Sequence, residues 1–183
     1  GRSWKPCSTR SPQARSSQYF IGSDAADAEG VVLIPDWARQ WQACLFDHGW
    51  MVPGYGPELG GRNATPTQTL LYLEELAARG ILRSLHFVGY AIVAPSLLEF
   101  GSPAQQALAP AAIRGDTIWC AGMSEPGAGS DLASLATRAL DEGDHFRVNG
   151  QKVWTSYAMR AAKCLCYVRS DPDAPRHAGI SAL

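Results

Sequence analysis

The sequence lacks an excess of charge of either sign. Its 183 residues hold 16 Lys and Arg against 17 Asp and Glu, which gives a formal net charge of −1. Proteins that bind nucleic acid or anionic membrane surfaces usually carry a strong positive charge for that purpose. The composition therefore predicts neither nucleic acid nor a membrane as a partner.

Long apolar runs are also missing. The longest run, residues 87–98, is interrupted by Gly89 and Pro95. A helix needs about 20 apolar residues to cross a bilayer. The sequence thus predicts no membrane span, and its length fits one or two domains.

The five cysteines and four histidines form no ligand pattern. The cysteine number is odd, and the spacings match neither a disulfide framework nor a zinc site. Cys164 and Cys166 alternate in a strand-like run and are expected to pack on one face. We predict no metal site and a reducing compartment, the cytoplasm, with the mitochondrial matrix as the alternative.

Residues 1–30 differ in composition from the rest. The stretch 1–23 contains four basic residues, many serines and no acidic residue. This composition predicts a disordered tail, and a transit peptide is the alternative.

Residues 31–115 carry helix signals. Asp36 is a candidate N-cap, and Leu70 and its helical neighbours are expected to face inward. Two capping boxes, Thr65–Gln68 and Ser102–Gln105, place Pro at the first helical position. Pro95 is expected to end or bend a helix. The expected helices are residues 36–48, 66–79, 83–100 and 103–113.

Residues 116–183 carry strand signals, and Asn149-Gly150 is the strongest hairpin signal among them. The expected strands are residues 117–123, 135–140, 145–148, 151–156, 163–169 and 179–183. Helices followed by strands predict an α+β fold with segregated domains. We expect an all-α N-terminal domain over 31–115 and a partial antiparallel β-barrel or sandwich middle domain over 116–183.

A glycine-rich turn runs from Ser124 to Asp131, with the sequence SEPGAGSD. Such a turn exposes backbone N–H groups and hydroxyls to a ligand. It is not a Walker loop, a dinucleotide-binding fingerprint or a nucleophile elbow, because Asp131, Leu132 and Ala128 stand where those motifs need other residues.

A second segment, Trp154-Thr155-Ser156, lies in an expected strand. Residues two apart in a strand point to the same face. Trp154 and Ser156 would then present a flat aromatic ring and a hydroxyl together, which suits a planar, heteroatom-rich ring.

Together the two segments resemble the flavin-binding signature of the acyl-CoA dehydrogenases, and the resemblance covers roughly residues 35–183. It also includes Gly49–Pro53, Leu73–Ala77 and Val148–Ser156. The resemblance implies FAD as cofactor and α,β-dehydrogenation of acyl-CoA thioesters. It further implies an electron-transfer flavoprotein or similar acceptor and a homo- or hetero-oligomer.

By this resemblance Ser124 would lie against the pyrimidine side of the flavin, with Ser130 near the flavin phosphates or the acyl-CoA. Trp154 would cover the ring and Ser156 would hydrogen-bond near N5. Tyr157 departs from the family pattern, in which Gly or Asn is commoner. The implied cofactor-binding residues are Ala121, Met123, Ser124, Gly129, Ser130, Trp154, Thr155 and Ser156, and Ser130 is also the implied substrate-binding residue.

No catalytic residue is assigned within the chain. The resemblance implies a glutamate general base on a C-terminal helical bundle, expected beyond Leu183, so the chain alone is expected to be inactive. Glu74 and Glu75 are interpreted as a solvated helix face, and Glu125 as support for the turn. Two alternatives stay open: a flavin oxidase or monooxygenase of the same fold, and a non-catalytic truncated homologue that acts through subunit packing.

Overall fold

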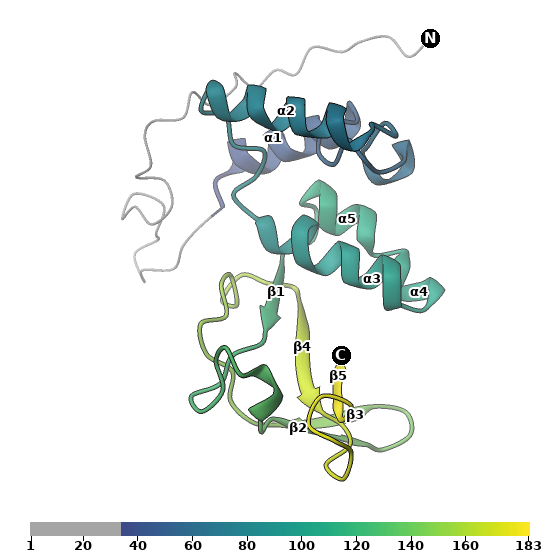
Figure 1. Ribbon diagram of the computed structural model, residues 1–183, viewed down its shortest axis with the longest axis vertical. Coiled ribbons are helices and arrows are strands. Elements are labelled where there is room, and N and C mark those ends of the chain that lie inside the picture. Colours follow the sequence, from purple (N-terminus) through teal and green to yellow (C-terminus); the bar gives the residue numbers. More distant parts are fainter. Residues whose placement is uncertain (1–33) are drawn as a thin grey trace. The chain divides into compact units, whose positions relative to one another are not determined.

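A computed structural model describes residues 34–183, which form two compact units (Figure 1). The first unit ends at Ile118, and the second comprises Trp119–Leu183. The first is helical and the second contains the strands. The predicted order of an α domain followed by a β domain is therefore confirmed, while the expected tail at residues 1–30 lies outside the described residues.

Two predicted capping boxes begin helices of the first unit. Thr65 Oγ1 accepts from Gln68 N at 3.2 Å, and Gln68 Oε1 accepts from Thr65 N at 2.9 Å. Ser102 and Gln105 repeat this arrangement. The elements are α1 (Asp36–Asp47), the 3₁₀ turn η3 (Pro57–Leu59), α2 (Pro66–Ala78), the π-helical η4 (Val88–Val93), α3 (Ala94–Phe100), α4 (Pro103–Gln106) and α5 (Ala109–Arg114).

Other helix boundaries differ from the prediction. Asp36 is not a cap, because Pro35 occupies that position and Asp36 lies in the first turn of α1. Near Pro95 the π-helical η4 ends and α3 begins, with Pro95 in the first turn of α3. Proline is accommodated there because the backbone N–H groups of a first turn have no partner within the helix. The expected last helix is divided into α4 and α5, because Pro110 is accommodated only in the first turn of a new helix.

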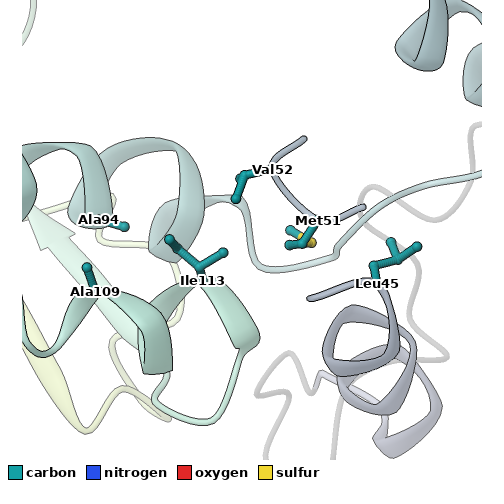
Figure 2. Close-up of a cluster of buried hydrophobic side chains, with 6 residues drawn as sticks. All are labelled: Leu45, Met51, Val52, Ala94, Ala109 and Ile113. Carbon is teal, nitrogen blue, oxygen red and sulfur yellow. The ribbon is translucent and has the colours of Figure 1, made fainter. Parts of the chain in front are cut away.

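The core of the helical unit is small and apolar. It joins the end of α1 and the following loop to α3 and α5 (Figure 2). Helix α2 contributes no buried residue, and Leu70 is 57% exposed. The prediction that Leu70 faces inward is therefore wrong. The buried cluster consists of Leu45, Met51, Val52, Ala94, Ala109 and Ile113.

The second unit contains a mixed sheet with β4 at its centre (Figure 1). Strand β4 pairs in parallel with β1 and antiparallel with β5, while β2 and β3 form an antiparallel hairpin. The expected antiparallel sheet is thus corrected to a mixed one. The elements are β1 (Trp119–Gly122), the 3₁₀ turn η5 (Leu132–Ser134), β2 (Arg138–Asp141), β3 (Phe146–Asn149), β4 (Lys163–Arg169) and β5 (Ile180–Ala182).

The hairpin does not turn at Asn149-Gly150 as predicted. It turns between β2 and β3, where Glu142 N donates to His145 O at 2.9 Å and Gly143 has φ +96°. The segment 151–156 is not a strand. Ladder pairing ends because both backbone groups of Thr137 have other partners: its N–H donates to Glu125 and its carbonyl accepts from Arg169 N.

Among the described cysteines, Cys120, Cys164 and Cys166 are free thiols. A Cβ at Gly122 would lie 3.4 Å from Cys166 Sγ and 3.5 Å from Cys164 Sγ. The two thiols therefore share a face of β4, as expected.

Within residues 34–183, no helix combines the length and the apolar character that a membrane span requires.

Candidate functional site

The glycine-rich turn is a short closed loop. Glu125 N donates to Ala128 O at 2.8 Å, and Ala128 N donates to Glu125 O at 3.1 Å. A Cβ added at Gly127 or Gly129 would meet no atom within 4 Å. Because neither glycine has a positive φ, the fold itself does not require glycine at these two positions. The space above the turn is open to a ligand.

The second segment has a different geometry from the one predicted. Trp154 and Tyr157 adopt left-handed backbone conformations, with φ +57° and +67°. The prediction that Trp154 and Ser156 share a strand face is therefore wrong. The Trp154 ring is instead presented to solvent, with 91% of its surface exposed. The positive φ at Tyr157 gives a physical reason why Gly or Asn would suit that position better.

Hydrogen bonds bring the two segments together. Lys152 Nζ donates to Met123 O at 3.1 Å and to Glu125 Oε1 at 2.8 Å. Val153 N donates to Ser124 O at 2.9 Å. The residues just before Trp154 are thus fixed against the start of the glycine-rich turn, although 27 positions separate Lys152 from Glu125.

Glu125 also binds the backbone of residues 136–137 and so fixes it beside the junction of the two segments. Its carboxylate accepts from Ala136 N at 2.6 Å and from Thr137 N at 2.9 Å. Burial by itself raises the pKa of this carboxyl group. The hydrogen bonds from Lys152, Thr137 and Ala136 outweigh that effect and lower the pKa to about 2. The side chain of Glu125 is only 7% exposed, so these bonds are shielded from water.

A pH dependence of stability follows from this depressed pKa. The pKa of Glu125 falls from an ordinary value of 4.5 to about 2 on folding, so its contribution is complete above pH 4.5 and is lost as the pH falls toward 2. The shift in this pKa therefore contributes roughly 3 kcal/mol to the free energy of unfolding when the carboxyl group is fully ionised.

We expect the stability difference between wild type and E125Q to shrink by about 2 kcal/mol between pH 5 and pH 2.5, because part of the linkage is lost only below the folded pKa of about 2. Urea unfolding at a series of pH values measures it. A difference that stays constant across the series would contradict the assignment.

The implied cofactor residues divide between the two segments. Ala121 belongs to β1, with Met123 and Ser124 directly after it, and the hydrogen bonds above place the last two beside residues 152–153. Gly129 and Ser130 are exposed on the turn, whereas Thr155 is half-buried and Ser156 is exposed.

Sequence reasoning missed Lys152. It lies two residues before Trp154, in a stretch that the sequence predicts to be a strand and that belongs to the family resemblance, but the sequence assigns the residue no role. Its hydrogen-bond partner Glu125 is predicted to support the turn, and the hydrogen bonds of the Glu125 carboxylate agree with that role. A charged residue inside a ligand-binding motif was the only available signal, and it does not identify the partner.

Comparison with known proteins covers both units. The family model for the acyl-CoA dehydrogenase N-terminal domain matches residues 24–116, and the model for the acyl-CoA dehydrogenase middle domain matches residues 120–183.

Two similar relatives come from Mycobacterium tuberculosis. Acyl-CoA dehydrogenase FadE34 is 44% identical over 86% of this chain and 22% of its own length. Acyl-CoA dehydrogenase IpdE1 is 40% identical over 79% of this chain and 38% of its own length. The chain thus spans less than half the length of these relatives.

A solved structure shares the fold. The ChsE4–ChsE5 complex from Mycobacterium tuberculosis matches with a TM-score of 0.68 and 36% identity, over 81% of this chain and 38% of the other. The two family models, together with these relatives, show that the chain belongs to the acyl-CoA dehydrogenase family.

Proposed function

We propose that this chain supplies the flavin-facing part of an FAD-dependent acyl-CoA dehydrogenase. The observation that carries the proposal is the junction between the two segments, where Lys152 and Val153 hold the residues before Trp154 against Met123 and Ser124. The junction brings an exposed indole and a turn rich in hydroxyls and N–H groups into one unit. The names of the relatives FadE34 and IpdE1 support the same reaction class.

The residues present fit a flavin. The open space over Gly127 and Gly129 leaves room for a ligand to approach the backbone closely. Trp154 offers an exposed aromatic surface of the kind that stacks on a planar ring. Ser124 and Ser156 would donate hydrogen bonds to polar atoms of that ring, and Ser130 would contact the flavin phosphates or the acyl-CoA.

When bound, FAD would supply the chemistry of accepting a hydride from the substrate β-carbon. The residues of this chain would bind and orient the ring, and their hydrogen bonds would favour negative charge on it. Glu125 does not serve as the general base, because its carboxylate is buried against Lys152 and its pKa is about 2. The base is not assigned to this chain.

We further propose the partners that this reaction requires. The substrate would be an acyl-CoA thioester, and an electron-transfer flavoprotein or similar acceptor would reoxidise the flavin. A homo- or hetero-oligomer is supported by the similar solved structure, which is described as a complex of ChsE4 and ChsE5.

A titration with FAD tests the proposal, and G129A is the informative variant. Because a Cβ at Gly129 would meet no atom within 4 Å, its melting temperature should stay within about 2 °C of wild type. A ligand that contacts the backbone at Gly129 would collide with the new methyl group, so we expect FAD affinity to fall about tenfold. Flavin fluorescence measures the affinity.

Three outcomes are informative. Failure of the wild-type chain to bind FAD would reject the proposed function for this chain. Equal affinity of wild type and G129A would show that the flavin lies elsewhere. Rapid reoxidation of the reduced flavin by oxygen would favour the oxidase or monooxygenase alternative over the dehydrogenase.

A further inference from the structure

Lys152 lies at the junction of the two segments, and the family resemblance gives it no role. Its ammonium group has two partners, the Glu125 carboxylate and the Met123 carbonyl. Its side chain is only 13% exposed. A buried lysine with two hydrogen bonds is held in one conformation, unlike a surface lysine whose ammonium group moves freely in water.

The bonds made by Lys152 and Val153 orient two successive peptide units. The Met123 carbonyl faces Lys152 Nζ, and the Ser124 carbonyl faces Val153 N. A trans peptide unit points its C=O and its N–H in opposite directions, and residues 34–183 contain no cis peptide bond. The Ser124 N–H is therefore turned away from Lys152.

The next peptide unit obeys the same geometry. The Ser124 carbonyl accepts from Val153, so the Glu125 N–H must point to the other side. It does, because it donates to Ala128 O at 2.8 Å and closes the glycine-rich turn. One set of bonds from residues 152–153 thus sets both the direction of the Ser124 N–H and the closure of the turn.

A neutral side chain could not replace Lys152 in this arrangement. The ammonium group has three donors and a positive charge, which match a carboxylate and a carbonyl oxygen together. An apolar residue of similar size would leave the Glu125 carboxylate buried without its cation and the Met123 carbonyl without this donor. The Met123–Ser124 peptide would then be free to rotate.

We infer that Lys152 is a positioning residue for the bound flavin. By bridging Met123 and Glu125 it holds the Met123–Ser124 peptide so that the Ser124 N–H and hydroxyl face the ligand. The chemistry that this pair of donors recognises is a carbonyl or imine acceptor on a planar heterocycle, such as the pyrimidine end of a flavin. The inference rests on the proposed function.

The test compares K152M and K152R with wild type in the complete 183-residue chain. Two quantities are measured: amide hydrogen exchange at Glu125 and Val153 without ligand, and FAD affinity by fluorescence titration. For K152M we expect exchange at both amides to rise about tenfold or more, and FAD affinity to fall about 10- to 100-fold. K152R keeps the charge and donors in a larger, planar group, so both quantities should lie closer to wild type than those of K152M.

E142Q is the matched control, because Glu142 forms an ion pair with Arg147 at 2.7 Å in the same unit but at the surface. It should change neither quantity. If K152M lowers the melting temperature but leaves the Glu125 and Val153 amides protected, Lys152 only packs and the inference is wrong. The inference is also wrong if both amides lose protection while FAD affinity stays at the wild-type value.

The two hypotheses fail in different ways. If the wild-type chain does not bind FAD, the proposed function is rejected, while the exchange measurement still decides whether Lys152 orients the peptide. If K152M does not fold, K152Q takes its place, since it keeps a donor for one of the two partners. We expect intermediate exchange and affinity for K152Q, and wild-type values in both would contradict the inference.

Discussion

Replacing Glu125 with alanine is expected to lower the free energy of unfolding by about 3 to 5 kcal/mol. The substitution removes the acceptor of three donors at once: Lys152 Nζ, Ala136 N and Thr137 N. It also leaves the Lys152 ammonium, whose side chain is 13% exposed, without its counter-charge. Urea unfolding at pH 7 measures the loss.

The double variant E125A/K152M separates the two causes. Removing the lysine as well removes the uncompensated charge but not the unsatisfied backbone donors at Ala136 and Thr137. We therefore expect the double variant to lose less stability than the sum of the two single variants. The control is E142A, whose surface ion pair with Arg147 is worth about 1 kcal/mol or less. Equal losses in E125A and E142A would show that the Glu125 carboxylate does not hold the fold together.

Replacing Gly150 with alanine is expected to lower the free energy of unfolding by about 3 kcal/mol. A Cβ at this position would lie 2.2 Å from Thr137 Oγ1 and 2.6 Å from Thr137 Cα. The side-chain oxygen can rotate away, but the backbone atom cannot move without disturbing the N–H that Thr137 donates to Glu125. The same urea unfolding experiment at pH 7 measures the loss.

G127A is the matched control for G150A. Its new methyl group would meet no atom within 4 Å, so its stability should stay within about 0.5 kcal/mol of wild type. A stable G150A would contradict the close approach of Gly150 to Thr137.

The local features of the helical unit were predictable because their causes lie within a few residues. The capping boxes at Thr65 and Ser102 need only a side chain and a backbone N–H three positions apart. The division between α4 and α5 also has a local cause, the proline at position 110, but sequence reasoning gave it no weight.

The strands were harder to predict, because pairing depends on partners far along the chain. Asn149-Gly150 is a strong local hairpin signal, yet the chain does not turn there. The neighbouring Thr137 directs its N–H to Glu125 and its carbonyl to Arg169, which ends the ladder. A local signal was overridden by hydrogen bonds that only the folded unit provides.

In the candidate site, too, local features were predictable and long-range contacts were not. The sequence by itself determined the family resemblance, the two segments and the residue types that a flavin would contact, because these lie in short contiguous stretches. Only the tertiary structure decided how the segments meet. Lys152 and Glu125 are 27 positions apart, and no local pattern joins them. Their pairing and the depressed pKa of Glu125 arise because a buried charge needs a partner wherever the fold can bring one.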